Sequence, residues 1–335
     1  MGARAWSAIA IVALAGCLDA DQRCGPGSLA AGADRACAMP GWLDRGYDVH
    51  VPAGWDGASA LPVVMLFHGG GGNRGGADRT TCPVGAVDSP QCLAARATAR
   101  GFVVVVPDGT GGRPLRGIRT WNAGGGEDGW DCTSGAACRS GVDDVAYVGD
   151  LLAELGTAVP IDPRRLYATG ISNGGAISHR LACELPTPLA AIAPVAGANQ
   201  FADTGGACPR ATPVLQIHGT EDPCWQYDGG TQACLGEGGR KTSVATTLEG
   251  WRLRNGCAPT FVDTALPDVD PTDGVTVTHR VWDGCAAATE LYRQDGAGHT
   301  WPSGWPYFGE DRIGRVGRDI GNDQLLDFFA SHVAP

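Results

Sequence analysis

Short apolar runs alternate with helical patterns from about residue 47 to the end of the chain. This alternation is typical of βαβ units and predicts an α/β fold with a mostly parallel central sheet and helices on both faces. The run 102–106 is apolar throughout, as central strands buried on both faces require. The alternating segment 275–278 instead indicates a half-exposed edge strand. Strands are expected at 47–51, 61–68, 101–107, 165–171, 190–196, 213–218, 275–282 and 290–294.

Four helices are expected between these strands. The first runs over 143–155, with Asp143 or Asp144 as its cap and Gly156 as its stop. The others cover 174–185, 243–255 with Ser243 as its cap, and 322–332. Proline-rich or serine-rich linkers, repeats and changes of composition are absent from residues 40–335. We therefore expect residues 41–335 to form a single catalytic domain, acting as a monomer.

Composition narrows the classes of partner. The chain has 43% hydrophobic and 18% charged residues, which is ordinary for a globular protein. Its net charge is −11, and no basic cluster could follow a phosphate backbone, so nucleic acid is excluded as a partner.

The N-terminus has the pattern of an export signal. Arg4 precedes an apolar stretch over 8–15 that is too short to span a bilayer as a mature helix. Residues 14–17, Leu-Ala-Gly-Cys, resemble a bacterial lipobox, which makes 1–16 a signal peptide, Cys17 a lipid anchor and 17–40 a tether. The alternative is an ordinary cut after Ala15. The lipobox is favoured because using Cys17 leaves an even number of the 13 cysteines for disulfides in an oxidising compartment.

The remaining cysteines are expected to form disulfides. Pairing of nearest neighbours along the chain is the simplest hypothesis. A zinc site is the alternative, but the sequence has no C-x-x-C pair and no finger-like Cys–His spacing, so no metal is expected. The expected pairs are Cys24 with Cys37, Cys82 with Cys92, Cys132 with Cys138, Cys183 with Cys208, Cys224 with Cys234, and Cys257 with Cys285.

The segment Gly170-Ile171-Ser172-Asn173-Gly174 lies where an apolar strand pattern changes to a helix start. A serine on a sharp turn between a strand and a helix is the nucleophile elbow of α/β-hydrolases. Its flanking glycines permit the close chain approach that such a turn needs. The motif alone is weak in a glycine-rich chain, so the assignment of Ser172 depends on finding its partners.

A nucleophilic serine needs a histidine base and an acid, which follow it in the order Ser, acid, His in this fold. Asp222 follows the strand 213–218, and we expect it to be the acid, with Glu221 as a fallback. His299 lies in a glycine-rich loop after the strand 290–294 and is the expected base. The other histidines, including His218, are expected to be structural.

The developing negative charge on the substrate also needs donors. His68 is followed by four glycines after a buried strand, so the amides of Gly69 and Gly70 are unobstructed, and the amide of Asn173 offers a further donor. A phosphate-binding turn or a flexible loop is the alternative, but the G-x-x-x-x-G-K-[ST] and G-x-G-x-x-G phosphate motifs are missing. No cofactor is expected.

Taken together, these motifs resemble the polyhydroxybutyrate depolymerase and feruloyl esterase family, secreted α/β-hydrolases often grouped with carbohydrate esterase family 1. The resemblance covers roughly residues 44–332. It rests on His68-Gly69-Gly70, Gly170-Ile171-Ser172-Asn173-Gly174-Gly175, 193–197 (Ala-Pro-Val-Ala-Gly), His218-Gly219-Thr220-Glu221-Asp222-Pro223, Asn255-Gly256-Cys257 and Gly298-His299-Thr300-Trp301-Pro302.

The resemblance implies a secreted or surface-anchored serine ester hydrolase that works through an acyl-enzyme and carries Ser172, Asp222 and His299 as its triad. It also implies that Trp121, Asn122 and Trp301 lie near the pocket, and Trp225 is a further aromatic expected to contact substrate. Feruloyl-type or other plant-polysaccharide esters are the favoured substrates, because the chain lacks the polymer-binding module of most polyester depolymerases. Polyhydroxyalkanoate oligomers are the alternative. A serine peptidase and a non-catalytic surface lipoprotein are weaker alternatives.

Overall fold

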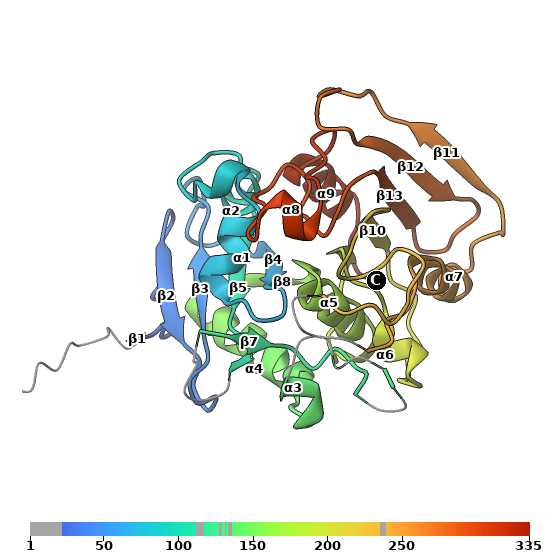
Figure 1. Cartoon of the computed structure of the whole chain (residues 1–335). Helices are drawn as coiled ribbons and strands as arrows, with labels where there is room; N and C mark the ends of the chain where they lie inside the picture. The colour runs from blue at the N-terminus through green and yellow to red at the C-terminus, as the bar shows by residue number, and fades with distance from the viewer. Residues whose placement is uncertain (1–21, 112–116, 127–128, 131, 133–135, 235–238) are drawn as a thin grey trace, which may run out of the picture.

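The computed structural model describes residues 22–111, 117–126, 129–130, 132, 136–234 and 239–335 (Figure 1). The expected signal peptide, its cleavage sites and Cys17 lie outside the described residues.

A single large sheet runs through the molecule, in the strand order β1-β2-β3-β5-β4-β8-β9-β10-β13-β12-β11. The six strands from β5 to β13 in this order are parallel to one another. β3 and β2 on one flank and β12 and β11 on the other pair antiparallel, and the short β1 pairs parallel with β2. The strands are β1 (Gln22–Arg23), β2 (Asp34–Ala38), β3 (Gly46–His50), β4 (Leu61–Phe67), β5 (Val103–Pro107), β8 (Ile161–Ile171), β9 (Ala191–Val195), β10 (Val214–Gly219), β11 (Phe261–Ala265), β12 (Thr276–Trp282) and β13 (Thr289–Asp295). A small second sheet pairs β6 (Thr110–Gly111) with β7 (Arg119–Thr120).

Helices cover both faces of the sheet (Figure 1). Side chains of α4 (Asp144–Ala158), α5 (Asn173–Glu184) and α7 (Val244–Arg254) pack on one face, with Val63, Met65 and Phe67 of β4. Those of α1 (Arg74–Thr80), α2 (Leu93–Ala99) and α9 (Asn322–Ala330) pack on the other face, with Val64 and Leu66. The alternation along β4 therefore separates two cores, as a strand buried on both sides requires. Shorter helices are η1 (Pro83–Gly85), α3 (Ala136–Arg139), α6 (Gln200–Asp203) and α8 (Glu310–Ile313).

The sequence patterns predicted eight strands and four helices, and the structure contains each of them with shifts at the ends. The N-terminal caps also agree, since Asp143 accepts from the amide of Ala146 and Ser243 from that of Thr246. The predicted stop at Gly156 is wrong, because α4 continues through Gly156 to Ala158. The prediction of an edge strand at 275–278 is wrong. β12 pairs on both sides, and the outer strand is β11, whose residues are all exposed.

Residues 22–40, which the sequence assigned to a tether, contribute β1 and β2 to the main sheet. β2 pairs antiparallel with β3, and Cys24 is bonded to Cys37 within this segment. Both cysteines are fully buried, so the segment packs as part of the catalytic fold.

Six disulfides occur in the described part of the chain. They join the same pairs that nearest-neighbour pairing predicts, and the sequence separations range from 6 to 28 residues.

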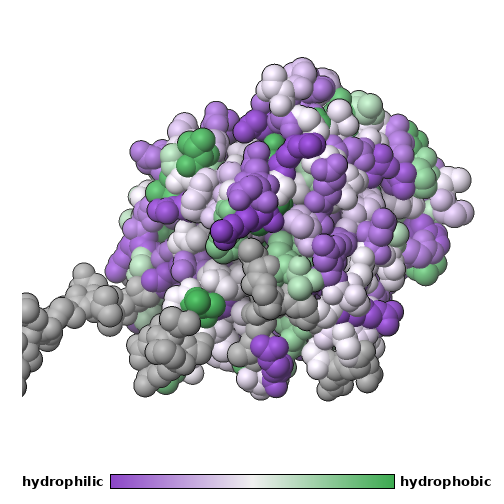
Figure 2. Space-filling model, viewed as in Figure 1, coloured by the Kyte–Doolittle hydropathy of each residue, from purple (hydrophilic) through white to green (hydrophobic). Residues whose placement is uncertain are grey.

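The surface in Figure 2 shows hydrophilic residues interspersed with small hydrophobic areas. Over the described ranges, none of the helices has the length and apolar character needed to cross a membrane.

Candidate active site

Ser172 stands on a strained turn between the end of β8 and the start of α5. Its φ of 59° lies in the left-handed region that non-glycine residues rarely adopt. Two neighbouring glycines make the turn possible, because a Cβ at Gly174 would collide with the carbonyl of Phe67, and one at Gly197 would collide with the carbonyl of Ser172 itself. The backbone strain and the close packing have the geometry expected of a nucleophile elbow.

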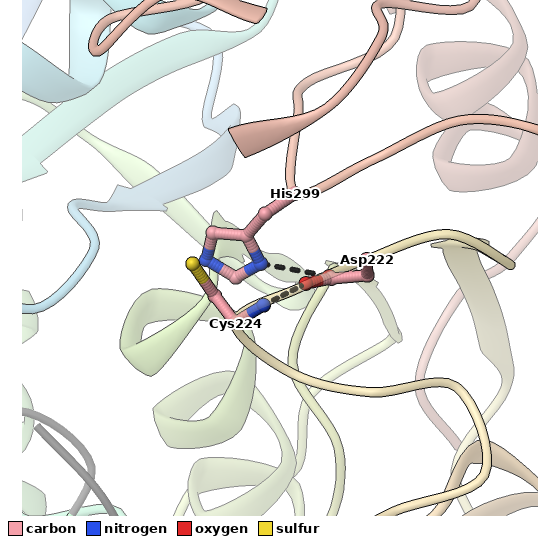
Figure 3. Close-up of side chains that lie close together, drawn as sticks. All are labelled: Asp222, Cys224 and His299. Carbon is pink, nitrogen blue, oxygen red and sulfur yellow. Dashed lines mark hydrogen bonds and ion pairs between the residues drawn. The ribbon is translucent and has the colours of Figure 1, made fainter. Parts of the chain in front are cut away.

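Asp222 and His299 meet at the carboxyl ends of two adjacent strands, β10 and β13 (Figure 3). The Nδ1 atom of His299 lies 2.7 Å from Oδ2 of Asp222. The other carboxylate oxygen accepts hydrogen bonds of 2.7 Å from the amides of Cys224 and Trp225. Both side chains are almost fully buried, and His299 contributes to the wall of the pocket.

The electrostatics of Asp222 favour its charged form. Burial alone would raise the pKa of this carboxyl, but the neighbouring His299 and hydrogen bonds from His218 and His299 outweigh burial and lower the pKa below its usual range. A permanently ionised carboxylate next to Nδ1 fixes the imidazole tautomer and stabilises the imidazolium. Glu221 does not take this place, because its side chain is 62% exposed and lies near Arg315.

Ser172 and His299 line the same pocket, which has a volume of about 280 Å³. The glycine loop after β4 forms another part of its wall, including Gly69 and Gly70. The structure therefore brings Ser172, His299 and the glycine loop to one pocket, whereas Asn173, the other predicted oxyanion donor, is not among the residues that line it.

His68 fixes the glycine loop from below. Its Nδ1 lies 2.8 Å from the carbonyl of Gly69, and its Nε2 accepts from the amide of Gly109 at 2.9 Å. Burial lowers the pKa of His68 to about 3, so the ring is neutral and Nδ1 is the donor. Because a trans peptide places C=O and N–H on opposite sides, the N–H of Gly70 points away from His68.

The predicted substrate contacts need correction, because none of Trp121, Asn122, Trp225 and Trp301 lines this pocket. The three tryptophans are at most 1% exposed. Trp121 donates to the carbonyl of His68, and Asn173 holds the backbone of Trp121 through two hydrogen bonds. These large side chains support the loops of the site, and their polar atoms are already bonded within the protein.

Trp225 and Trp301 anchor the loops that carry the acid and the base. The indole of Trp225 donates to the carbonyl of Thr242, and that of Trp301 donates to Asn322. The side chain of Asn122 donates to the carbonyl of Val142. Sequence position near a catalytic residue does not reveal whether an aromatic ring faces the pocket or the core.

Side chains that the sequence reasoning missed line the pocket instead, and they include Thr80, Lys241, Tyr307 and Phe308. Phe308 is 52% exposed and therefore lies at the rim. The only available signal was the Trp-Pro-Tyr-Phe segment at 305–308, which follows the histidine loop. The Cys224–Cys234 disulfide also lines the pocket, immediately after the acid.

Ligand atoms of Asp222, Cys224 and His299 lie within 4.8 Å of one another (Figure 3). The sulfur of Cys224 is bonded to Cys234, and both oxygens of Asp222 accept hydrogen bonds. A disulfide sulfur is not a thiolate ligand, so this donor set does not fit a metal ion.

The chain is similar in sequence and in fold to several known esterases. No family model matches the chain. It is 29% identical to feruloyl esterase B of Piromyces equi over 62% of this chain and 35% of that protein, so it spans about a third of that relative. It is 25% identical to feruloyl esterase C of Emericella nidulans over 85% of this chain and 83% of that protein. Among solved structures, acetyl xylan esterase from Aspergillus awamori superposes with a TM-score of 0.53 at 15% identity, over 89% of this chain and 99% of that one.

The fold is that of an α/β-hydrolase, as the sequence predicted, and the relatives that the chain resembles are esterases. Its resemblance to the feruloyl esterase family is likewise confirmed.

Proposed function

We propose that the protein is an exported serine esterase that works through an acyl-enzyme, with Ser172 as nucleophile, His299 as base and Asp222 as the orienting acid. The observation that carries the proposal is the convergence of three features on one pocket: the strained turn at Ser172, the His299–Asp222 pair at 2.7 Å, and the glycine loop at Gly69 and Gly70.

In the first half of the reaction, Oγ of Ser172 attacks the ester carbonyl carbon while its proton moves to Nε2 of His299. The C–O bond to the alcohol then breaks, and His299 returns the proton to the leaving oxygen. In the second half, His299 takes a proton from water, which attacks the acyl carbon. The bond between the acyl carbon and Oγ then breaks, and His299 returns the proton to Oγ, which releases the acid and restores Ser172. Asp222 stays ionised throughout and holds the Nδ1–H of His299.

The carbonyl oxygen becomes negative in each tetrahedral intermediate. The amides of Gly69, Gly70 and Asn173 are the proposed donors to it. The orientation of the Gly70 amide away from His68 supports this role, as does the position of Asn173 at the start of α5.

For the substrate, we propose feruloyl-type or other plant-polysaccharide esters. Two observations favour this class: the relative from Emericella nidulans is a feruloyl esterase, and Tyr307 and Phe308 provide aromatic surface in the pocket wall. Aromatic rings pack well against a planar phenolic acyl group.

Export is proposed from the cysteines. Six disulfides are stable only in an oxidising compartment, which supports a destination outside the cytoplasm. Attachment through Cys17 and action as a monomeric catalytic unit are parts of the same proposal.

The first test is covalent labelling with a fluorophosphonate probe, followed by peptide mapping. Wild-type protein should label at Ser172, and Ser172→Ala should not label. His299→Ala should reduce labelling and turnover by about a thousandfold or more. His279→Ala is the matched control and should behave as wild type, because His279 pairs with Glu290 away from the pocket. Absence of labelling in wild type would overturn the proposal in favour of a binding protein.

The second test is the hydrolysis rate on p-nitrophenyl acetate, butyrate and octanoate, methyl ferulate and 3-hydroxybutyrate oligomers. Preference for methyl ferulate would support the proposed substrate class. Preference for the oligomers would reassign the enzyme to polyester degradation, and labelling without any ester turnover would point to a peptidase.

A further inference from the structure

A chain of buried hydrogen bonds extends from Asp222 into the core behind the pocket. Nε2 of His218 lies 3.4 Å from Oδ2 of Asp222, and Nδ1 of His218 lies 3.3 Å from Nε2 of Gln216. Oε1 of Gln216 lies 3.1 Å from Nε2 of His179, and Nδ1 of His179 accepts from the indole of Trp251 at 3.0 Å. His218, Gln216, His179 and Trp251 are all fully buried.

The groups at the two ends of this series of hydrogen bonds determine which way each bond is donated. An indole N–H can only donate, and a carboxylate can only accept. In the middle, the amide of Gln216 has one possible orientation, because its Nε2 lies 3.0 Å from the carbonyl of Gly197 and must donate to it. Oε1 of Gln216 therefore faces His179 and accepts from it.

Each histidine tautomer follows from this direction. His179 accepts at Nδ1, so its proton is on Nε2, and burial lowers its pKa to about 3, which keeps the ring neutral. His218 accepts from Gln216 at Nδ1, so its proton is on Nε2. That N–H lies between the carbonyl of Trp225, at 2.8 Å, and Asp222.

We propose that His218, Gln216 and His179 form a directed hydrogen-bond relay that positions the carboxylate of Asp222 for His299. These are positioning residues, and the proposal rests on the roles assigned to Asp222 and His299 in the proposed function. Oδ2 accepts from His299 and has Nε2 of His218 at 3.4 Å, and Oδ1 accepts from two backbone amides, so the carboxylate cannot rotate without losing these contacts.

The relay also connects the acid to the nucleophile. Gln216 bonds the carbonyl of Gly197, whose Cα packs against the carbonyl of Ser172, and His179 lies on α5, which begins directly after Ser172. His218 holds the carbonyl of Trp225, the last residue of the turn that starts at Asp222. The relay therefore fixes the relative positions of the two loops that must cooperate.

The first test does not depend on activity. Long-range 1H–15N correlation spectra of the 15N-histidine-labelled full chain at pH 7 should show His179 and His218 as neutral Nε2–H tautomers, assigned with His179→Gln and His218→Gln. An Nδ1–H tautomer or an imidazolium at His218 would overturn the proposal. If the labelling test fails but these tautomers are found, the proposed function fails and the hydrogen-bond network stands.

The second test reverses the relay. In its ionised form, the carboxylate of Gln216→Glu offers only acceptors to both histidines, so the proton of His218 moves to Nδ1 and Nε2 no longer donates toward Asp222. The histidine spectra of the variant establish that this tautomer is present before kcat is compared. We expect kcat on p-nitrophenyl acetate to fall about ten- to a hundredfold, as for loss of a hydrogen bond to a charged group, with KM within about twofold. Gln324→Glu is the matched control, because a carboxylate can still accept from the amide of Gly321. Unchanged kcat in folded Gln216→Glu would overturn the relay.

A pair of variants covers the case in which Gln216→Glu does not fold. His218→Gln keeps an N–H donor toward Asp222, and His218→Leu removes it. The glutamine variant should retain a kcat at least about tenfold above that of the leucine variant. Equal values would contradict the relay. If neither variant folds, the histidine spectra of the wild-type protein remain the test of the proposal.

Discussion

At the scale of single residues, His68 shows how a buried side chain can set the direction of a backbone amide. Its neutral ring holds the Gly69 carbonyl, and this orients the Gly70 N–H. We predict that His68→Ala lowers kcat by about a hundredfold, the typical effect of losing one oxyanion donor, with little change in KM. Steady-state kinetics against His279→Ala would measure this. An unchanged kcat would show that the loop is held without His68.

The buried histidines also predict how stability depends on pH. The pKa values of His68 and His179 are lowered from 6.5 to about 3 in the folded protein, because burial disfavours the imidazolium. Below pH 6.5 the unfolded chain therefore binds protons that the folded protein does not. Each of these histidines makes the folded state less stable as the pH falls from 6.5 toward 3, by about 1.4 kcal/mol per pH unit.

This contribution can be isolated by substitution, because other groups oppose it. Burial raises the pKa of Asp48 to about 6, which stabilises the folded state as the pH falls. We predict that the unfolding free energy of His179→Gln depends on pH less steeply than that of wild type between pH 6.5 and 4. The difference in slope should correspond to about one fewer proton taken up on unfolding. Urea unfolding at several pH values would measure the difference, and parallel curves would contradict the assigned pKa of His179.

At the scale of elements, the turn between β8 and α5 depends on glycines for space. A Cβ at Gly174 would meet the carbonyls of Phe67 and His68, whereas a Cβ at Gly149, in α4, would meet nothing within 4 Å. We predict that Gly174→Ala destabilises the protein by about 1–3 kcal/mol and reduces labelling of Ser172. Gly149→Ala should raise stability by about 0.5–1 kcal/mol through helix propensity. Thermal unfolding of both variants checks the contrast, and equal effects would contradict it.

The sequence predicted some strands and helices and missed others, and burial accounts for most of the difference. β4 and β5 were predictable because burial on both faces makes them continuously apolar, and β8 because its buried second half, 166–171, has few polar residues. β2 and β11 were missed because most of their residues are exposed. Backbone pairing with a neighbouring strand identifies them as strands, and the burial of side chains does not. α1 was missed because Gly75 and Gly76 lower its helix propensity.

The part of the site that lies directly after predicted strands could be identified from the sequence. Ser172, Asp222 and His299 each follow a recognisable strand, and parallel strands bring their carboxyl ends to one edge. The tryptophans were misassigned because proximity along the chain does not determine which way a ring points. The relay through Gln216 was invisible for a related reason, since residues 179, 216, 218 and 251 meet only through the packing of α5 and α7 on β10.

At the scale of the whole molecule, the six disulfides connect segments near in sequence, and their loops differ in length. In the chain-entropy account, a longer closed loop removes more freedom from the unfolded state. Cys183–Cys208 encloses a separation of 25 residues and Cys132–Cys138 only 6. The first joins the end of α5 to the segment before β10, so it also constrains the two elements that carry the nucleophile and the acid.

We therefore predict that the double variant Cys183→Ala/Cys208→Ala loses about 3 kcal/mol of stability, and Cys132→Ala/Cys138→Ala about 2 kcal/mol. The pocket does not include either disulfide, so fluorophosphonate labelling of the folded variants should remain near that of wild type. Urea unfolding under non-reducing conditions measures the two losses. A larger loss for the 132–138 pair would show that native contacts of the loop, and not closure entropy, set the contribution of these disulfides.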